Sequence, residues 1–288
     1  MRSTRNEEIV NRRDFVRSGM LVGGALTLAD GAAAGQPRPA NRRSGVIDTH
    51  CHAGKGLNYG KDHATCDPWT TYNDPKWVLR QAEQAGIERS VIFPISNITY
   101  AKANEEIAGY VRQYPDRLIG FAKHDPKAEA GKIRALLVRE VRELGLKGLK
   151  LHAVPTPEIL ETVAELRIPI LMHPPRVGDC LEVVRSHPQI SFILAHLGSF
   201  ASRDWKEHLL AIEAAKHLPN LYLDTSAVVF FLYLERAAQE LPAEKLLFGS
   251  DAPLVDARVE LAKIQLLKLP QDKQEKILGG NIRRLLRI

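Results

Sequence analysis

Short runs of apolar residues alternate with longer amphipathic stretches from position 46 to the end of the chain. The runs are rich in Val, Ile, Leu and Phe and are too short for helices, which is typical of strands buried on both faces. They predict eight strands, at 46–52, 89–95, 118–124, 146–152, 168–173, 190–197, 221–226 and 246–251.

The stretches between these runs have apolar residues at helical spacing. In 131–144, for example, Ile133, Leu137, Val141 and Leu144 recur every three or four positions,. Further helices are predicted at 75–86, 158–167, 180–187, 203–218, 231–241, 254–268 and 272–287. Eight strands alternating with helices over about 250 residues predict an α/β fold of the (β/α)8 TIM barrel type, as a single domain over 46–288.

A doubly wound open sheet is the alternative fold. It would carry its ligand near one switch point of the sheet. No Gly-x-Gly-x-x-Gly turn follows the first predicted strand, which disfavours a dinucleotide-binding sheet,.

Charge and composition exclude one class of partner. The 288-residue chain has a formal net charge of +6, but its Lys and Arg alternate with Glu along helical stretches and only 6% of residues are aromatic. Such a pattern is typical of a solvated surface, so we expect no nucleic-acid partner.

The N-terminus has the features of an export signal. Arg12 and Arg13 are followed by Phe15 and Arg17, and then by the weakly apolar, Gly/Ala-rich stretch 19–35. We interpret 1–35 as a cleavable signal peptide of the twin-arginine type, followed by a short segment at 36–45. The stretch is too short for a stable membrane anchor. These residues predict the twin-arginine export machinery as a partner and a periplasmic or secreted location.

The three cysteines have different expected roles. Cys51 lies between two histidines of a strand, so alternation turns it away from the barrel interior as a small buried hydrophobe,. Cys66 and Cys180 lie in loops after the first and fifth predicted strands. In an oxidising compartment they could form a disulfide.

Candidate metal ligands stand at the carboxyl ends of several predicted strands. These residues are His50 and His52 in VIDTHCH, His173 in ILMHP and Asp251 in FGSDAP. In a closed barrel the carboxyl ends of the strands converge, and residues two apart on a strand face the same side. Three imidazoles and a carboxylate suit one divalent ion such as Zn²⁺, which can acidify a bound water.

Other polar residues end strands in the same way. His196 in FILAHLG could be a fifth ligand, but we expect it to polarise the substrate oxygen, which makes Asp251 and His196 the predicted catalytic residues. Lys150 and His152 alternate with Leu149 and Leu151 and are expected to bind substrate. Carboxylation of Lys150 would instead make the site binuclear.

Three more polar residues have expected positions or roles outside the predicted ligand set. Asp48 lies one pleat below His50 and is expected to orient the ligands from beneath. His124 ends the third predicted strand and is a candidate pocket residue. His208 stands in the middle of a predicted helix, and we expect it to be exposed.

Together these segments resemble the amidohydrolase superfamily, in its amidohydrolase-related branch that includes aminocarboxymuconate-semialdehyde decarboxylase. The resemblance covers 46–287 and is carried by DTHCH (48–52), KGLKLH (147–152), HP (173–174), AHLG (195–198), GSDAP (249–253) and LGGN (278–281). It implies a (β/α)8 barrel with a divalent metal, most often zinc, held by His50, His52, His173 and Asp251, with His196 as the catalytic polar residue.

The predicted function is metal-dependent hydrolysis of a small carbonyl compound, such as an amide or a lactone, by a metal-activated water. A non-oxidative decarboxylase of the same branch is the alternative, and a barrel that binds a ligand without turnover is a second one. The substrate is expected to be a small molecule, and a homo-oligomer is left open.

Overall fold

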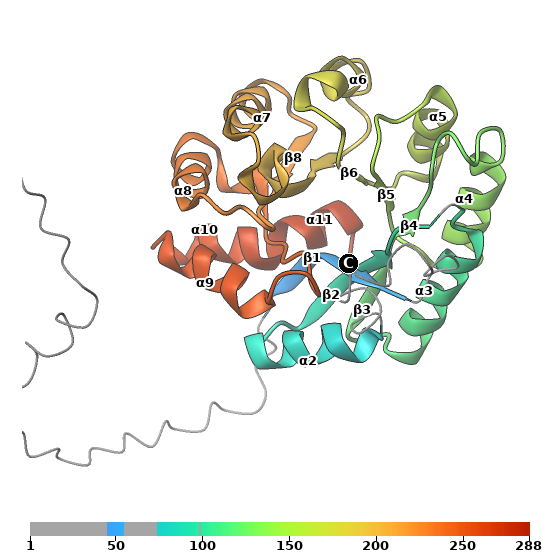
Figure 1. Cartoon of the computed structure of the whole chain (residues 1–288), viewed down its shortest axis with the longest axis horizontal. Coiled ribbons are helices and arrows are strands. Elements are labelled where there is room, and N and C mark those ends of the chain that lie inside the picture. The colour runs from blue at the N-terminus through green and yellow to red at the C-terminus, as the bar shows by residue number, and fades with distance from the viewer. Residues whose placement is uncertain (1–44, 55–73, 98) are drawn as a thin grey trace, which may run out of the picture. The chain divides into compact units, whose positions relative to one another are not determined.

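The computed structural model describes residues 45–54, 74–97 and 99–288, which belong to one compact unit. Figure 1 shows a ring of helices around a central set of strands. The strands are β1 (Ile47–Ala53), β2 (Arg89–Pro94), β3 (Leu118–Gly120), β4 (Ala122–Lys123), β5 (Leu149–Leu151), β6 (Ile170–Met172), β7 (Phe192–Leu194), β8 (Leu221–Asp224) and β9 (Leu246–Leu247).

Helices follow the strands and form the outer layer (Figure 1). The α-helices are α2 (Pro75–Ala85), α3 (Ala101–Gln113), α4 (Ile133–Arg142), α5 (Pro157–Leu166), α6 (Leu181–Ser186), α7 (Trp205–His217), α8 (Phe231–Glu240), α9 (Ala257–Leu266), α10 (Gln271–Glu275) and α11 (Asn281–Leu286). Short 3₁₀ turns are η1 (Val177–Cys180), η2 (Ala195–Gly198), η3 (Phe200–Ser202) and η4 (Ala243–Lys245), and η5 (Lys276–Gly280) is a π-helical turn.

The strands close into a barrel. They form two parallel sheets, with the orders β1-β2-β3 and β4 to β9. At one seam the Phe121 N–H donates to the Ile92 carbonyl (2.9 Å), so β3 and β4 are two halves of one strand. At the other seam Thr49 N–H donates to the Phe248 carbonyl (2.9 Å) and Asp251 N–H to the His50 carbonyl (2.7 Å). The predicted closed barrel is therefore confirmed, and the open doubly wound sheet is excluded.

Two apolar clusters hold the unit together. One fills the barrel interior with alternate strand residues such as Val91, Ile119 and Leu171. The other lies between the strands and the helices. Ile282 and Leu286 of α11 join the interior cluster, and so this helix closes the barrel at the end where β1 begins.

The last predicted helix, 272–287, is interrupted in the structure. The chain forms α10, then η5, then α11. At η5, Gly279 approaches the backbone before β1 so closely that an added Cβ would lie 2.0 Å from the Gly45 carbonyl oxygen. The Phe248 N–H also donates to the Ile277 carbonyl in this turn (2.9 Å). The interruption brings the C-terminal segment against the seam between β1 and β9.

Helix starts follow from local sequence. Asp74, Asp204 and Asp256 are N-caps of α2, α7 and α9, and each side chain accepts from the backbone N–H two residues on. Such caps satisfy amides that have no partner within the helix. The sequence did not predict α3, in which Gly109 and several charged residues weaken the apolar pattern.

Two of the three cysteines, Cys51 and Cys180, lie in the described part of the chain. Cys51 is buried in the layer between strands and helices, as predicted. The Cys180 thiol is buried and donates to the Val177 carbonyl (3.2 Å). Cys66 lies outside the described residues, so the Cys66–Cys180 pairing stays a prediction.

The predicted export signal over 1–35 also lies outside the described residues, as does nearly all of the segment 36–45. In the described part of the chain, no helix is both long enough and apolar enough to span a membrane.

The expectation for His208 was wrong, because its side chain is fully buried. Its ring nitrogens lie 2.9 Å from the Leu197 carbonyl oxygen and 2.9 Å from the Ser202 hydroxyl. These partners lie in the two consecutive turns η2 and η3. His208 therefore fixes α7 to the loop that carries His196.

Candidate metal centre

β1 presents two histidines to the barrel interior. His50 and His52 are both buried, and their ring centroids are 5.5 Å apart. Cys51 between them points into the outer layer, as expected from alternation along a strand,. The side of β1 that faces the interior therefore carries both imidazoles at its carboxyl end.

Asp251 completes a three-residue cluster. Its Oδ1 lies 3.3 Å from His50 Nε2 and 3.2 Å from His52 Nε2. One ligand atom from each of the three residues lies within 4.8 Å of the others, so a single ion could bind all of them at ~2.0–2.2 Å,. The buried Oδ2 of Asp251 has no hydrogen-bond partner among the described residues. Two imidazoles and a carboxylate fit a divalent ion in chemistry and in spacing.

The charge state of the cluster also fits a metal. Burial lowers the pKa of His50 and His52 well below the usual range for histidine, and the Lys150 and Lys123 ammonium groups lower it further. Neutral imidazole is the form that binds a metal. Burial raises the pKa of Asp251 to about 8, although Lys150 opposes the rise. A bound cation would favour the ionised carboxylate.

Asp224 at the end of β8 orients His50. Its Oδ2 accepts a hydrogen bond from the Nδ1–H of His50. This contact leaves the lone pair of Nε2 facing Asp251, and a carboxylate behind a ligand histidine is a common arrangement in metal sites. Asp224 was not among the candidates predicted from the sequence, although it lies near the carboxyl end of the seventh predicted strand, 221–226, where the other candidates were found.

Asp48 acts through the backbone. Its Oδ1 accepts from the N–H groups of His50 (3.1 Å) and Ser250 (2.9 Å), which joins β1 to the segment that follows β9. Burial raises its pKa to about 6, although its hydrogen bonds lower it. Asp48 therefore positions His50 by holding its main chain rather than its ring.

His196 lies beside His50. The ring centroids are 4.7 Å apart, and Nδ1 lies 3.0 Å from the Ser226 hydroxyl and 3.2 Å from the Ser226 carbonyl oxygen. His196 and Leu197 have positive φ angles of 57° and 51°. Non-glycine residues in this conformation carry strain and are concentrated at functional sites. The turn directs the imidazole into the site.

His173 and His152 lie further from the cluster. The His173 ring centroid is 4.8 Å from that of His196 and 5.5 Å from that of His152. His173 is not one of the three grouped ligands, so its role as the fourth ligand stays a prediction. Burial and, next, Lys150 lower its pKa to about 4.

Two buried lysines adjoin the site. Lys150 Nζ is 3.4 Å from His50 Nε2 and 5.2 Å from the Phe93 ring centroid. Burial lowers the pKa of Lys150 to about 8, although Asp224 and Asp251 raise it. Lys123, which the sequence analysis missed, is fully buried at the end of β4. Ile119 and Phe121 of the same segment belong to the interior cluster, so strand alternation was the signal for it.

The His124 imidazole contacts two buried carboxylates rather than facing a substrate. Its two ring nitrogens lie 2.9 Å from Glu129 Oε2 and 2.8 Å from Glu140 Oε2. Burial alone would lower the pKa of His124, but the two carboxylates outweigh it and raise the pKa to about 9. Although His124 is part of a cavity wall, both nitrogens are already engaged.

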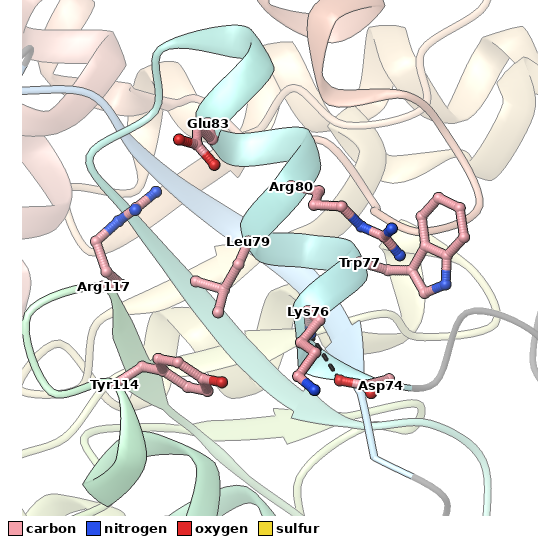
Figure 2. Close-up of a pocket in the computed structure, with 8 residues that line it drawn as sticks. All are labelled: Asp74, Lys76, Trp77, Leu79, Arg80, Glu83, Tyr114 and Arg117. Carbon is pink, nitrogen blue, oxygen red and sulfur yellow. Dashed lines mark hydrogen bonds between the residues drawn. The ribbon is translucent and has the colours of Figure 1, made fainter.

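A cavity of about 630 Å³ opens beside the site. Its wall is formed by the last residue of β4 and by residues that follow β2, β4, β5 and β6, including Tyr100, Lys123, His152, Val154, Pro175 and Asp179. A separate hollow of about 440 Å³ runs along α2, where Figure 2 shows Trp77, Arg80 and Glu83 of the helix with Tyr114 and Arg117 from the segment before β3. It contains none of the candidate ligands.

The structure is similar to solved structures at low sequence identity. The 5-carboxyvanillate decarboxylase LigW from Sphingomonas paucimobilis is 14% identical, with a TM-score of 0.63 over 84% of this chain and 99% of that one. A dihydroxybenzoic acid decarboxylase from Polaromonas sp. JS666, with bound manganese and the inhibitor 2-nitroresorcinol, is 19% identical, with a TM-score of 0.66 over 84% and 97%. The 4-oxalomesaconate hydratase LigJ from Rhodopseudomonas palustris is 19% identical, with a TM-score of 0.62 over 84% and 95%.

A search of curated proteins by sequence found no match. The sequence model of the family described as Amidohydrolase matches residues 47–288, from the start of β1 to the last residue. The resemblance stated from the sequence motifs is thus confirmed, and the chain belongs to the Amidohydrolase family.

Proposed function

We propose that this protein is a metal-dependent, non-oxidative decarboxylase of a small carboxylic acid. The observation that carries the proposal is the placement of Asp251, whose Oδ1 faces His50 and His52 while its buried Oδ2 has no hydrogen-bond partner among the described residues. When Oδ2 is protonated, it can deliver its proton to carbon. Two of the three similar structures described above are decarboxylases, which supports this reaction over the hydrolysis preferred from sequence.

The proposed reaction needs one bond to break and one to form. The bond between the substrate carbon and its carboxylate breaks, CO₂ leaves, and the electron pair remains on the carbon. The proton of Asp251 then forms the new C–H bond. Water returns a proton to Asp251, and the hydroxide that remains leaves to solvent, where it combines with CO₂ to form bicarbonate. No oxidant or reductant is required.

The two carboxyl oxygens of Asp251 have separate proposed roles, metal binding for Oδ1 and proton transfer for Oδ2. Its Oδ1 faces His50 and His52, and its Oδ2 has no partner among the described residues. His50, His52 and Asp251 would hold the ion, with His173 as the predicted fourth ligand. Such an ion supplies positive charge that stabilises electron density on the substrate.

The other residues bind and orient the substrate. In the tautomer in which the Ser226 hydroxyl donates to His196 Nδ1, the Nε2–H of His196 can donate to a substrate oxygen,. Lys150, 3.4 Å from His50 Nε2, brings a cation to the same place and suits an anionic substrate. His152 in the cavity wall would contact the rest of the substrate.

The metal is proposed to be zinc, as the sequence resemblance implies. The manganese of the Polaromonas decarboxylase is the alternative, because histidine and carboxylate ligands accept both ions,. Elemental analysis of protein purified without added metal distinguishes the two.

Hydrolysis is the second candidate. A carboxylate oxygen without a partner could also take a proton from water, as Oδ2 of Asp251 would in a hydrolase,. The name of the matching family, Amidohydrolase, also refers to hydrolysis.

The test is turnover in D₂O by protein loaded with zinc or manganese. The substrates would be 5-carboxyvanillate, 2,6-dihydroxybenzoate and 4-oxalomesaconate, and products would be followed by NMR and CO₂ release. Decarboxylation would release CO₂ and place one deuterium on the vacated carbon. Release of new carboxyl groups without CO₂ from added lactones or amides would support the hydrolase and contradict the decarboxylase.

We further propose that the chain is exported through the twin-arginine route. Arg12 and Arg13 with the weakly apolar stretch after them support this. Replacing both arginines by lysine in the full chain should retain the protein in the cytoplasm, as cell fractionation would show. Unchanged fractionation would contradict export by this route.

A further inference from the structure

The buried amino group of Lys123 stands beside the proposed site and has no hydrogen-bond partner among the described residues. The Lys123 side chain is 1% exposed. The nearest described aromatic contact is the Tyr100 ring, whose centroid is 5.3 Å from Nζ. Burial and the nearby Lys150 hold the pKa of Lys123 well below its usual range, and an anion bound at Nζ would favour the charged form. A buried polar group without a hydrogen-bond partner is costly, so such a group calls for a ligand.

The main chain of Lys123 is held firmly. Its N–H donates to Asn104 Oδ1 (2.9 Å), and its carbonyl oxygen accepts from Asn104 Nδ2 (3.0 Å). Asn104 Nδ2 also donates to Glu140 Oε1 (2.8 Å), and Glu140 binds His124. Asn104 and Glu140 are both buried. The neighbouring network thus fixes Lys123 from behind and leaves its ammonium group unused.

The Lys123 side chain lines a cavity in which a ligand could pair with it. Lys123, Tyr100 and His152 are part of the wall of the 630 Å³ cavity, together with the apolar side chains of Val154 and Pro175. The three grouped metal ligands are not in that wall. Lys150 lies instead at the ligands, 3.4 Å from His50 Nε2. Lys123 and Lys150 are neighbours across β4 and β5, but their side chains serve two different parts of one site.

We propose that Lys123 binds a second anionic group of the substrate, which makes the substrate a dicarboxylic acid. One carboxylate lies near Lys150 and Asp251, and the other pairs with Lys123 at the cavity wall, where Tyr100 and His152 flank it. The choice of which carboxylate reacts rests on the proposed decarboxylase function, but binding at Lys123 does not.

Binding of unreactive probes tests the anchor directly. Benzoate, benzene-1,3-dicarboxylate and benzene-1,4-dicarboxylate would be titrated into metal-loaded protein by calorimetry. Wild-type protein should bind one of the dicarboxylates at least tenfold more tightly than benzoate. Lys123→Met should abolish that preference and leave benzoate binding within about twofold. Lys127→Met is the matched control, because Lys127 is in the same cavity wall but is exposed, and it should keep the preference.

The outcomes separate the anchor from the reaction. A wild-type protein without preference for either dicarboxylate, or a Lys123→Met variant that retains the preference, would overturn the anchor. Decarboxylation could still be seen in that case. Conversely, intact dicarboxylate preference without CO₂ release from any carboxylic acid would overturn the proposed reaction and keep the anchor.

Stability gives a second readout for the same residue. Without ligand, Lys123→Met should raise the melting temperature, since it removes a buried polar atom that has no hydrogen-bond partner among the described residues and keeps the side chain's length. Metal content should stay equal to wild type. A lowered melting temperature would mean that the ammonium group already has a structural partner, and would overturn the proposal.

Discussion

The carboxylate of Asp224 accepts a hydrogen bond from the Nδ1–H of His50 and so decides which nitrogen of His50 faces Asp251. The two residues are 174 positions apart and meet only because β1 and β8 both belong to the closed barrel. Burial raises the pKa of Asp224, while its hydrogen bonds with Ser226 and the nearby Lys150 lower it.

The Asp224→Asn variant should bind its metal ion about 10- to 100-fold more weakly. The amide can donate to Nδ1 and so favour the wrong tautomer of His50, and it also removes a negative charge behind the ligand. Titration of metal-free protein with zinc, against a competing chelator, measures the change. Asp272→Asn, at an exposed position of α10, is the control and should match wild type. Equal zinc affinity in the two variants would show that Asp224 does not orient His50.

Metal content distinguishes one ion from two. We expect about one ion per chain, held by the cluster of His50, His52 and Asp251. Lys150→Ala should keep this content, because its unmodified ammonium group is no ligand. Two ions in wild type and one in Lys150→Ala would instead establish a carboxylated, bridging lysine. His52→Ala should lose the ion in either case.

The close approach of Gly279 predicts a strong effect on stability. An alanine Cβ there would meet the Gly45 carbonyl oxygen, which is backbone and cannot swing away. Gly279→Ala should therefore lower the free energy of unfolding by about 3 kcal/mol, the upper end for overpacking. Gly109→Ala in α3 should raise it by about 0.5–1 kcal/mol, because an added Cβ meets nothing closer than Arg112 Nη2 at 3.9 Å,. Denaturant unfolding of both variants checks the contrast, and a Gly279→Ala variant as stable as wild type would contradict it.

The barrel could be predicted from sequence because each strand is a distinct apolar run. The candidate ligands were found because they end such runs, and in a closed barrel those ends meet. The same two rules would also have found Asp224 and Lys123, the second because it shares a strand face with Ile119 and Phe121. They were not selected because histidines were preferred as candidate ligands. His124, for example, was selected and its neighbour Lys123 was not.

Other features depend on contacts that no local pattern contains. The burial of His208 results from the η2 and η3 turns, where His196, Leu197 and Ala201 adopt positive φ angles. The π-helical turn η5 depends on the approach of Gly279 to Gly45, far away in sequence. Propensity and periodicity describe neighbours along the chain, and so they do not predict these contacts.

The His124 cluster predicts how stability depends on pH. In the folded protein, the hydrogen bonds that His124 donates to the carboxylates of Glu129 and Glu140 outweigh burial and raise the pKa of His124 to about 9, from 6.5 for the free side chain. The folded state therefore holds a proton that the unfolded state releases between these two values. The stabilisation is complete below pH 6.5, decreases as pH rises, and is lost above pH 9. Its size is on the order of 3 kcal/mol.

The His124→Gln variant isolates this contribution, because all other titrating groups remain. Its free energy of unfolding should fall well below that of wild type at pH 6, and the gap should narrow by pH 9.5. His217→Gln is the control, since the exposed pair of His217 with Glu213 contributes little,. Urea unfolding at both pH values measures the gap. A gap that is constant with pH would mean that His124 is neutral in the folded state and packs between the carboxylates without its second proton.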